Sequence, residues 1–569
     1  MTIGTPAFFR WEHHPFVPPP ELQAGSATQP DVIVAGAGPV GLTAALSLAQ
    51  QGIKVLLLEA RDCLSENSRT LAVTRRSVQI LDRLGVARRF EQLAITRERN
   101  YLYRGAELVY SAPYEHSDTE KHPDISVLQQ PWTEKVLLDA VAAHPLIDLR
   151  WLSPVTGVTL DDPARAQVTV STQAGEYTVS ARYVVAADGA RGAVRRCLGL
   201  KYQEIAAGVV QRNFIICDFE RKSSLPVARR LWVNPPHRPG TSVILHKQPF
   251  DTWRLDYSLM EDEDLDEAMK PENVERQIRA QLELLGDTTA EDDWRLVWVS
   301  AYRPMSRSLP SYRHGPVFFA GDAAHQTPIF GGRGMNQGML DAANLAWKLS
   351  FVLQGHAPPR LLDSYDAERR PVIVRNLLDI AQATLCMTAT TKGAALMRNA
   401  AIDLLPAEAF VRRLIDAFNA NRSESLLTPP PVPASQGVIA GSPLPDGPVR
   451  IAGTEERRFL HDLLKPHALT LLYFSGQGQV PAGLRETFSH LKEQAAPCHA
   501  VCVAAEASEA AADAADAVAF DIDGITFAKL DARDGTCLII RPDGYVGARL
   551  EHPTADGFLR AWRHVLGES

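Results

Sequence analysis

The segment between residues 31 and 59 limits the fold more than any other part of the sequence. A short apolar run at 31–35 leads into Gly36-Ala-Gly38-Pro39-Val-Gly41, which opens an apolar segment with the composition of a helix. A second apolar run follows at 53–58. This pattern predicts a strand, a helix and a second strand parallel to the first, because parallel neighbours need a crossover connection.

The glycine spacing in this unit is typical of a dinucleotide site. Gly36 permits the tight turn, Gly38 lets the backbone approach a pyrophosphate at the helix N-terminus, and Gly41 permits close packing of helix on strand. Pro39 suits the first helical position. Glu59 ends the second strand, where its carboxylate can accept hydrogen bonds from ribose hydroxyls. We therefore expect a bound dinucleotide, but this motif alone does not separate NAD from FAD.

Two later segments repeat the combination of glycine and aspartate after an apolar strand. Residues 182–187 lead into Asp188-Gly-Ala-Arg-Gly192-Ala-Val-Arg, and residues 317–320 lead into Gly321-Asp322-Ala-Ala-His325-x-x-Pro328. Gly334-Met335-Asn336 then opens an apolar helical stretch at 334–353. A carboxylate at the end of a strand can bind sugar-alcohol hydroxyls. Backbone N–H groups at a helix start favour negative charge nearby.

In this order, the three motifs resemble those of the flavoprotein aromatic hydroxylases. These are single-component FAD monooxygenases that include phenol hydroxylase-like and 3-(3-hydroxyphenyl)propionate hydroxylase-like members. The resemblance covers about residues 31–375 and includes Ser68-Arg69 and Gln130-Pro-Trp-Thr-Glu134, which by themselves would be a surface arginine and a helix cap. The family usually has Ser at the position of Gly192. The cofactor-binding residues that the resemblance implies are Gly36, Gly38, Pro39, Gly41, Glu59, Ala60, Arg61, Arg69, Gln130, Asp188, Gly321, Asp322, Gly334, Met335 and Asn336.

The resemblance also implies a reaction. NADH or NADPH would reduce FAD, O₂ would form a flavin C4a-hydroperoxide, and its distal oxygen would enter a phenolic ring ortho or para to the hydroxyl, in aromatic catabolism. Pro328 matches the family's proline beside the reacting ring, so we expect it in the catalytic site, whereas His325 could brace the loop. No separate nicotinamide domain is expected.

Residues 206–300 have a different pattern, with apolar strands joined by Pro, Gly and Asp turns. We expect an antiparallel substrate sheet inserted into the Rossmann-like α/β FAD domain, as in p-hydroxybenzoate hydroxylase-like folds. Along residues 241–248, His246 and Gln248 share one face by the period of two. We therefore predict that both bind the substrate and that His246 also takes part in catalysis. Tyr257 is a further substrate-binding candidate. Each of the three could instead be a satisfied polar residue of a sheet.

The length of 569 residues corresponds to three or four domains at roughly 150 residues each. We expect a Pro-rich arm (1–30), an FAD-binding domain (31–205 and 301–375), the substrate sheet (206–300), a helical segment and linker (376–430) and a C-terminal domain (431–569). This last domain resembles the thioredoxin-like domain of phenol hydroxylase-type members. Its loop after the strand at 469–474 reads Ser475-Gly-Gln-Gly-Gln-Val, without a thiol. We predict that it is redox-inactive, with a structural or homodimer-contact role.

The composition excludes several other classes. With 59 basic against 67 acidic residues the net charge is −8, so there is no basic excess for nucleic acid or an anionic membrane. The seven cysteines have no ladder spacing, and Cys498 and Cys502 fit neither a redox pair nor a zinc site. No run of 18 apolar residues or leader pattern is present. We expect a cytoplasmic protein without metal.

Two other functions remain open at this stage. One is a flavin oxygenase that acts on a non-phenolic or polyketide-like ring. The other is an NAD-dependent dehydrogenase or a non-catalytic dinucleotide sensor. This reading rests on the first motif alone and leaves Asp188-Gly189 and Gly321-Asp322 unexplained.

Overall fold

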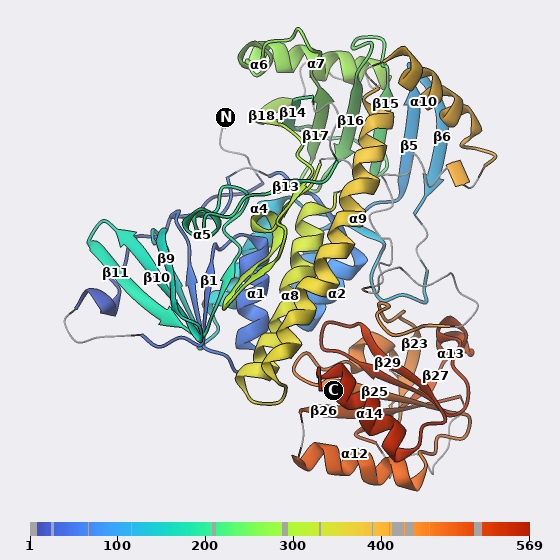
Figure 1. Ribbon diagram of the computed structural model, residues 1–569. Coiled ribbons are helices and arrows are strands. Elements are labelled where there is room, and N and C mark those ends of the chain that lie inside the picture. Colours follow the sequence, from blue (N-terminus) through green and yellow to red (C-terminus); the bar gives the residue numbers. More distant parts are fainter. Residues whose placement is uncertain are drawn as a thin grey trace.

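The computed structural model contains three units, each built on a β-sheet (Figure 1). It describes residues 8–23, 28–66, 68–114, 117–206, 212–286, 294–328, 332–389, 391–408, 410–411, 426, 437–454, 456–494, 496–505 and 515–568. The first unit holds the glycine motifs, the second is a large, mostly antiparallel sheet above it, and the third is formed by the C-terminal part of the chain.

The first unit is a six-stranded sheet with the order β20-β21-β12-β1-β2-β8. All neighbouring strands except the β20–β21 pair run parallel. Its strands are β1 (Val32–Ala35), β2 (Val55–Leu58), β8 (Ile147–Arg150), β12 (Tyr183–Ala186), β20 (Arg313–His314) and β21 (Val317–Phe319). The four residues of β1 and of β2 are all buried, as expected for a parallel sheet that is covered on both faces. The predicted strand–helix–strand unit is present.

Helices cover one face of this sheet and a small meander covers the other. On the helical face α1 (Pro39–Ala49) packs between α4 (Gln130–Ala142) and α8 (Gly334–Leu353). The meander has three strands: β9 (Val155–Asp162), β10 (Arg165–Thr172) and β11 (Gly175–Ala181). Helix α8 has the predicted bounds and is buried on almost every side, so it is a central helix of the molecule.

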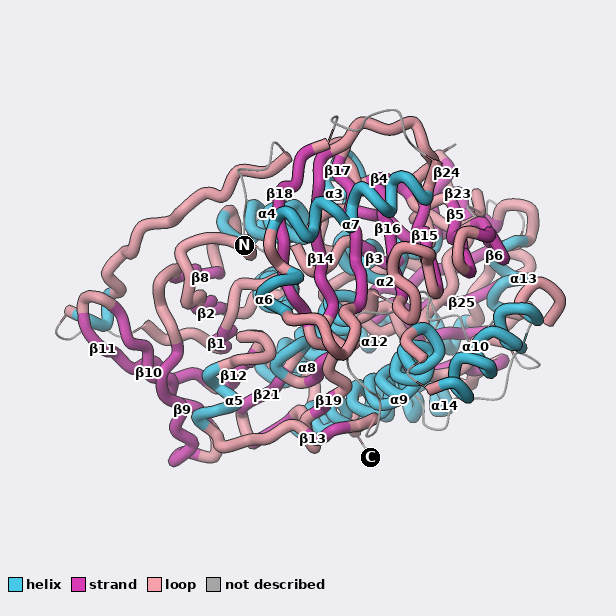
Figure 2. The backbone as a smooth tube through the Cα atoms, turned by 90° about the horizontal axis from the view of Figure 1, so that it is seen from above, coloured by secondary structure: helices cyan, strands magenta, loops and turns pink. Residues whose placement is uncertain are grey.

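The second unit is a seven-stranded sheet with the order β18-β14-β17-β16-β15-β5-β6. Its strands are β5 (Arg99–Arg104), β6 (Glu107–Pro113), β14 (Phe214–Glu220), β15 (Ala228–Val233), β16 (Ser242–Lys247), β17 (Thr252–Ser258) and β18 (Arg295–Tyr302). Helix α7 (Pro271–Leu284) lies across its outer face (Figure 2). The sheet therefore extends beyond the range 206–300: β5 and β6 come from the range assigned to the FAD domain, and β5 pairs in parallel with β15.

Shorter elements join the first two units. Helices α2 (Arg75–Arg83) and α3 (Ala87–Leu93) and the small sheet of β3 (Ala72–Thr74), β7 (Ile125–Val127) and β4 (Ile95–Thr96) lead into β5. Helix α9 (Asp363–Met387) contains Pro371 and runs from the first unit to the antiparallel sheet, where α10 (Lys392–Leu404) follows it (Figure 1). No single described helix is long and apolar enough to cross a membrane, although α9 and α10 pass that test as one bent pair.

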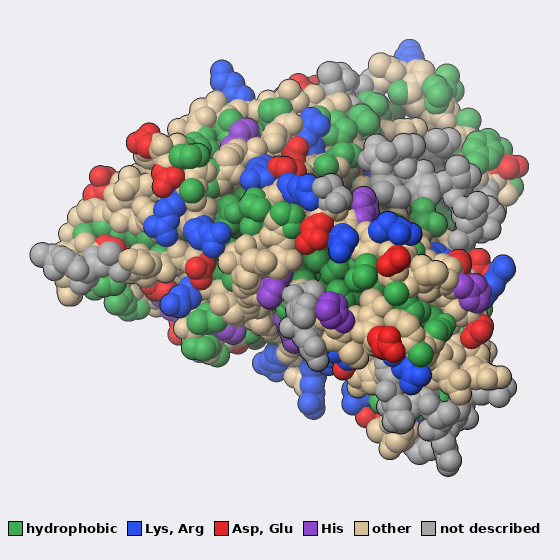
Figure 3. Space-filling model, turned by 60° about the horizontal axis from the view of Figure 1, so that its bottom comes forward, with side chains coloured by type: hydrophobic (Ala, Val, Ile, Leu, Met, Phe, Trp, Pro, Cys, Tyr) green, Lys and Arg blue, Asp and Glu red, His purple; other side chains and the backbone are tan. Residues whose placement is uncertain are grey.

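The third unit is a mixed seven-stranded sheet with the order β24-β23-β27-β26-β25-β28-β29. Its strands are β23 (Pro448–Ile451), β24 (Arg457–Phe459), β25 (Leu469–Ser475), β26 (Cys498–Ala504), β27 (Ala517–Asp521), β28 (Thr536–Ile540) and β29 (Val546–Glu551). Its helices are α12 (Ala482–Gln494), α13 (Ile525–Leu530) and α14 (Ala555–Val565). Most of the expected linker, including Pro429–Pro433, lies outside the described residues. Figure 3 shows a face of the molecule on which acidic and basic side chains are interspersed.

Candidate active site

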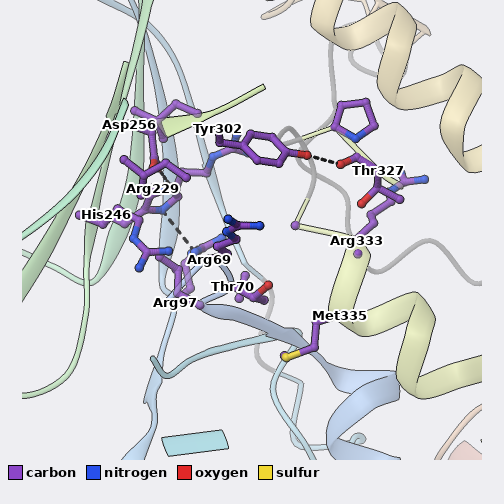
Figure 4. A pocket seen from close by; sticks show the side chains of 18 of the residues that line it. Arg69, Thr70, Arg97, Arg229, His246, Asp256, Tyr302, Thr327, Arg333 and Met335 are labelled. Atoms are coloured by element: carbon purple, nitrogen blue, oxygen red, sulfur yellow. Dashed lines mark hydrogen bonds and ion pairs between the residues drawn. The ribbon is translucent and has the colours of Figure 1, made fainter. Parts of the chain in front are cut away.

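A cavity of about 170 Å³ lies between the antiparallel sheet and the start of α8. Figure 4 shows Arg97, Arg229, His246 and Asp256 on one side and Thr327, Arg333 and Met335 on the other. The remaining lining comes from the loop before β3, from the inner face of the sheet and from the segment around β22 (His325–Gln326); these residues are Arg69, Thr70, Leu71, Ala72, Ile216, Ile244, Arg254, Tyr302, Asp322, Pro328, Gly332 and Gly334. The cavity thus joins the predicted cofactor motifs to the predicted substrate sheet.

The first glycine motif has the geometry that a pyrophosphate site requires. Gly36 has φ +98°, and a Cβ at Gly41 would lie 1.8 Å from the carbonyl oxygen of Gly36, so neither position accepts a side chain. At Gly38, by contrast, a Cβ would meet nothing within 4 Å. Pro39 begins α1, and no side chain caps the helix at Gly38. The free N–H groups of the first turn therefore face open space in which an anion could bind.

The acidic residue at the end of β2 is buried and is held by its neighbours. Glu59 Oε2 accepts the backbone N–H of Ala37 at 2.7 Å, and Oε1 accepts Nε of Arg61 at 3.1 Å. Ala60 and Arg61 are exposed beside it. The carboxylate is thereby fixed at the carboxyl edge of the sheet, next to the glycine turn, where a ribose could reach it.

The N-terminus of α8 forms the floor of the cavity. No side chain caps this helix at Arg333. The side chain of Asn336 is fully engaged: its Oδ1 accepts from Ser77 Oγ at 2.7 Å, and its Nδ2 donates to the carbonyl oxygen of Ala72 at 2.9 Å. Asn336 thus fastens the helix start to β3, while the backbone N–H groups of the first turn point toward the cavity with Met335 in its lining.

Asp322 and its glycines lie directly below this helix start. Asp322 lines the cavity with an exposed side chain. Gly321 has φ +59°, and a Cβ at Gly338 would lie 2.5 Å from Val40 Cγ2, so these glycines bring α8 against α1. A Cβ at Gly334 would lie 2.8 Å from Thr327 Oγ1. The two uncapped helix ends and Asp322 are the donor set that suits a dinucleotide with a flavin ring, and the residues present fit FAD.

Gln130 acts on the loop rather than on the cavity. Its Oε1 accepts the backbone N–H of Arg69 at 3.2 Å and of Thr70 at 3.3 Å, and its Nε2 donates to Glu134 Oε1 at 2.8 Å. Burial raises the pKa of Glu134, although Gln130 and Ser65 lower it. Gln130 thereby positions the loop that carries Arg69 into the cavity lining.

Asp188 lies outside the cavity lining and caps a short helix. Its Oδ2 accepts the backbone N–H of Val194 at 2.9 Å, near the start of α5 (Ala193–Cys197). A Cβ at Gly192 would lie 2.1 Å from Asp188 Oδ1. The glycine found where the resembling family usually has Ser is therefore explained by the position of the Asp188 carboxylate.

The polar face of the antiparallel sheet forms the opposite wall. His246 on β16 stands in register with Arg229 on β15 and with Arg254 on β17, and Arg254 in turn pairs with Asp218 on β14. Arg254 is bound by Asp218 through two contacts of 2.8 and 2.9 Å. Asp256 Oδ2 lies 3.5 Å from His246 Nε2, and its Oδ1 is buried without a hydrogen-bond partner in the described part of the chain.

Two sequence predictions for this sheet require correction. Tyr257 does not line the cavity, because on β17 it alternates with Asp256 and packs on the outer face among residues such as Trp253 and Ile278. Gln248 is on the inner face but is buried away from the cavity, where its Nε2 donates to Asp218 Oδ1 at 3.1 Å. Of the three substrate-binding candidates, only His246 lies in the cavity wall.

Burial and charge set the protonation of this wall. Burial, together with Arg97, Arg229 and Arg254, holds the pKa of His246 well below its usual range. Burial raises the pKa of Asp256 to about 7, although Arg254 and Arg229 lower it. His246 is therefore neutral near pH 7. Its Nδ1 faces a donor, Arg97 Nη2 at 3.5 Å, so the tautomer with the proton on Nε2 fits best.

Pro328 and His325 have separate positions. Pro328 lines the cavity near the start of α8, as predicted for the residue beside the ring. His325 is fully buried behind it, with Nε2 2.7 Å from Asp341 Oδ2, and the other oxygen of Asp341 accepts Nε of Arg369 at 2.7 Å. His325 therefore braces the loop.

Sequence reasoning missed Arg97, Arg229, Arg254, Asp256 and Tyr302, all of which line the cavity. A signal for two of them was present. In β17 the polar residues Arg254 and Asp256 alternate with apolar neighbours, which marks one face as polar. Arg97 gave no signal, because it precedes β5 and reaches the sheet only through tertiary folding.

This combination of a parallel dinucleotide-binding sheet, an inserted antiparallel sheet and a cavity between them defines the class of FAD-binding monooxygenase folds. Residues 29–379 match the model of the family described as "FAD binding domain", and this match covers more than half of the chain. The chain belongs to that family, and FAD is its cofactor.

Characterised relatives share about a third of their aligned residues with this chain. Pentachlorophenol 4-monooxygenase of Sphingobium chlorophenolicum is 30% identical over 61% of this chain and 63% of its own length. Para-nitrophenol 4-monooxygenase of Pseudomonas sp. (strain WBC-3) is 31% identical over 60% and 83%. Anhydrotetracycline monooxygenase of Streptomyces rimosus is 34% identical over 62% and 69%. The match thus spans less than two thirds of the first of these relatives.

Solved structures extend the similarity over nearly the whole chain. The flavin-dependent monooxygenase PieE, solved with FAD and substrate, has a TM-score of 0.78 at 23% identity and covers 95% of this chain and 100% of its own. At this identity the likeness shows the fold alone. The anhydrotetracycline hydroxylase OxyS of Streptomyces rimosus has a TM-score of 0.69 at 26% identity, over 94% and 99%.

Proposed function

We propose that the protein is an FAD-dependent hydroxylase of a single-ring phenol that uses NADH or NADPH and O₂. One observation carries this proposal: a single cavity is bounded on one side by the start of α8 and Asp322 and on the other by His246 and Asp256. Bound FAD would supply the redox chemistry, namely the activation of O₂ for insertion of one oxygen atom into the ring. The relatives named for pentachlorophenol and para-nitrophenol support a phenolic substrate.

The chain's own residues would bind the cofactor and place the ring. The first turn of α1, Glu59 and Asp322 would hold FAD, the first turn of α8 would favour negative charge on the flavin ring, and Arg69 would lie beside it. Pro328 would form the wall against the substrate.

Asp256 is the group best suited to accept the phenolic proton. A phenol is more easily attacked by electrophilic oxygen when its hydroxyl is deprotonated, so a nearby base assists the reaction. Asp256 Oδ1 is buried and without a hydrogen-bond partner in the described part of the chain, and its pKa of about 7 matches a base that works near neutral pH. Neutral His246 would orient Asp256 through the 3.5 Å contact from Nε2.

The relatives named for single-ring phenols favour a small substrate. The cavity of about 170 Å³ is lined by the start of α8 and Asp322 as well as by the antiparallel sheet, so its volume includes the space in which the flavin ring would lie. The second candidate function, oxidation of a polyketide-like ring system, is supported by the relative that is named for anhydrotetracycline.

We further propose that the C-terminal unit is a redox-inactive thioredoxin-like domain. Three adjacent strands, β25, β26 and β27, run parallel, and helices flank the sheet. The loop after β25 carries Ser475 and Gly476 and no thiol. This arrangement supports a structural role.

The function is tested with the purified, FAD-loaded protein and a panel of phenols. We expect a substrate phenol to accelerate NAD(P)H oxidation at least 10-fold over the rate without phenol. Mass spectrometry should show a product heavier by one oxygen atom. The proposal is wrong if the protein retains FAD but no phenol accelerates NAD(P)H oxidation, and polycyclic substrates would then be tested next.

A further inference from the structure

Three side chains of metal-binding types lie together where the N-terminal arm meets the loop between β2 and β3. Among the residues that the structure describes, the imidazole of His13, the carboxylate of Asp62 and the thiol of Cys63 form the one such group whose ligand atoms all lie within 4.8 Å of one another. No cysteine spacing in the sequence indicates this group, because His13 and Asp62 are 49 positions apart. None of the three lines the active-site cavity.

The fold itself brings these ligands to one place. His13 Nδ1 lies 2.9 Å from Asp62 Oδ2, and Cys63 is buried beside them, with 3% of the residue exposed. The backbone N–H of His14 donates to the carbonyl oxygen of Asp62 at 2.7 Å, which keeps the arm and the loop side by side without a metal. A metal ion therefore has little ordering to impose, and this favours its binding.

The separations suit a single zinc ion. Zinc bonds to a thiolate are about 2.3 Å long and those to imidazole and carboxylate about 2.0–2.2 Å, so two ligands of a tetrahedral ion lie about 3.5 Å apart. The side chains of His13 and Asp62 are 62% and 42% exposed, so they can turn by the small amount that this geometry requires. The same exposure leaves the fourth coordination position to water.

The charges around the thiol also favour a cation. Those that act on Cys63 include the negative charges of Asp62 and Glu66 and the positive charge of Arg61. Arg61 is bound through Nε to Glu59 at 3.1 Å, so its charge is shared with that carboxylate. A thiolate beside two carboxylates becomes favourable when a metal ion, the largest local charge, lies between them.

We propose that His13, Asp62 and Cys63 bind a zinc ion that fastens the arm to the loop between β2 and β3. On binding, a Zn–S bond forms, the Cys63 thiol releases its proton to solvent, and zinc keeps its oxidation state. The two anionic ligands balance the two charges of the ion, and the imidazole is a neutral ligand. Bonds to the metal replace the hydrogen bond between His13 and Asp62.

The ligand set selects zinc among the common metal ions of proteins. Calcium and magnesium take oxygen ligands, so neither explains a thiol in the group. An iron–sulfur cluster takes several cysteine ligands, and Cys63 is the only thiol in this described group. Thiolate, imidazole and carboxylate are all ordinary zinc ligands, and three protein ligands with one water make an open tetrahedral site.

The test uses the full-length, FAD-loaded protein after dialysis against a chelator. ZnCl₂ alone is the probe, and a competing chromogenic chelator reports the free zinc. We expect about one zinc ion per chain. Cys63→Ser and His13→Gln should each weaken zinc binding at least about 10-fold, because a change that only disturbs the surroundings of a ligand already costs that much. His13 is an exposed residue of the arm, so His13→Gln tests the site even if Cys63→Ser does not fold.

Two further variants and a proton count show which groups bind the ion. Cys197→Ser removes an exposed thiol, and His564→Gln removes an exposed imidazole on α14; both should bind zinc as the wild-type protein does. Calorimetric titration in two buffers of different protonation enthalpy gives the number of protons released. The wild-type protein should release about one proton more than Cys63→Ser does, since only the thiol must lose one.

Proteolysis of the arm tests whether the ion fastens it. Trypsin cleaves after exposed Arg10, but Phe9 and Trp11 on either side are packed against Trp132 and bonded to Ser65, so cleavage requires the arm to detach. Zinc at about ten times its dissociation constant should slow this cleavage about 10-fold, because it binds only the attached arm. In Cys63→Ser the same zinc concentration should leave the rate unchanged, which also controls for an effect on trypsin.

Several results would overturn the inference. The wild-type protein could fail to bind zinc, or it could bind zinc equally well in Cys63→Ser and His13→Gln, which would assign the metal to other surface groups. Equal proton release in the wild-type protein and Cys63→Ser would exclude the thiol as a ligand. Zinc that binds at this site without slowing the cleavage after Arg10 would show that the ion does not fasten the arm. These measurements involve neither a phenol nor NAD(P)H, so the proposed function is tested separately.

Discussion

At the scale of single residues, the polar wall of the cavity depends on Asp256 being buried. Ile216 and Ile244 flank it across the sheet, and Arg254 lies two residues before it on the same face. Because burial outweighs the neighbouring arginines, the pKa of Asp256 rises to about 7. The side chain can therefore exchange a proton in the pH range in which the reaction would run.

Asp256→Asn should remove a pH dependence. In the wild-type protein kcat/KM should rise between pH 6 and 8 as Asp256 ionises and becomes able to accept the phenolic proton. The variant should lose this rise and be about 100-fold slower at pH 8, the usual contribution of a positioned base. Measured pH profiles of both proteins decide the matter, and an unchanged profile would exclude Asp256 as the base.

Stability provides a check that the variant is folded. The pKa of Asp256 is higher in the folded chain than the ordinary 3.8, so its contribution to stability is present below pH 4 and is lost as the pH rises through 7. In Asp256→Asn the side chain cannot ionise, so the loss of stability above pH 7 does not occur. The variant should therefore not have a lower Tm than the wild-type protein at pH 8. Asp251→Asn, an exposed change on the same hairpin, should alter neither the Tm nor the profile.

At the residue scale, only part of the site could be predicted from the sequence. The glycine and aspartate motifs could be read because each is a local pattern with one backbone solution, and the structure brings Asp322, Gly334, Met335 and Pro328 to one cavity. Tyr257 was misplaced because the direction of a strand's faces depends on its partners. Arg97 and Arg229 meet only through the parallel pairing of β5 with β15, which no local pattern encodes.

At the scale of elements, the N-terminal arm has a definite position. Residues 8–23 of the arm pack on the loop that follows Glu59. Trp11 Nε1 donates a hydrogen bond to the carbonyl oxygen of Ser65 at 3.2 Å. The backbone N–H of His14 donates to the carbonyl oxygen of Asp62 at 2.7 Å. Phe9 packs edge-on against Trp132. The arm therefore holds the loop that carries Arg61 and Arg69.

The loss of this contact should loosen the cofactor. Trp11→Ala removes the bond to Ser65 and the apolar contact while leaving Glu59 and the glycine turn intact. We expect FAD to dissociate about 3- to 10-fold faster, since loop ordering contributes on the order of 1 kcal/mol. Flavin fluorescence after dilution measures the rate. Val17→Ala, in the same arm but 73% exposed, should leave it unchanged, and equal rates in all three proteins would show that the arm has no such role.

Elements with a strong periodic or apolar pattern were predicted well from the sequence. Helix α8 and the strands β1, β2 and β25 lie where their apolar runs indicated. The outer strands β5 and β6 were missed, because their partly exposed residues give only a weak pattern: in β5 only Leu102 is fully buried, and no residue of β6 is. Their place in the sheet is set by β15, more than a hundred residues later in the chain.

At the scale of the whole molecule, buried charges join the C-terminal unit to the flavin unit. Arg541, next to β28, binds both oxygens of Glu368 on α9 at 2.8 and 2.9 Å, and Lys348 on α8 binds Glu368 at 2.8 Å. Asp543 accepts Nδ2 of Asn344 on α8 at 3.0 Å. The C-terminal unit is thus fastened to the helix whose first turn forms the floor of the cavity, which supports its structural role.

Glu368→Gln should weaken this connection in a pH-dependent way. Burial alone would raise the pKa of Glu368, but Arg541 and Lys348 hold it well below the ordinary 4.5. Its stabilisation is therefore complete at pH 7 and is lost as the pH falls below 4.5. Breaking a buried pair costs about 3 kcal/mol, so urea unfolding should show this loss at pH 7 and a smaller one near pH 3.

Asp363→Asn is the control for that experiment, because Asp363 lies on the same helix and pairs with Arg313 but is 72% exposed. Exposed pairs contribute about 0.5 kcal/mol or less, so this variant should unfold almost as the wild-type protein does at both pH values. If Glu368→Gln matched Asp363→Asn at pH 7, the buried cluster would not hold the two units together. A loss at pH 7 that persisted unchanged near pH 3 would instead mean that the charge of Glu368 is not what stabilises the contact.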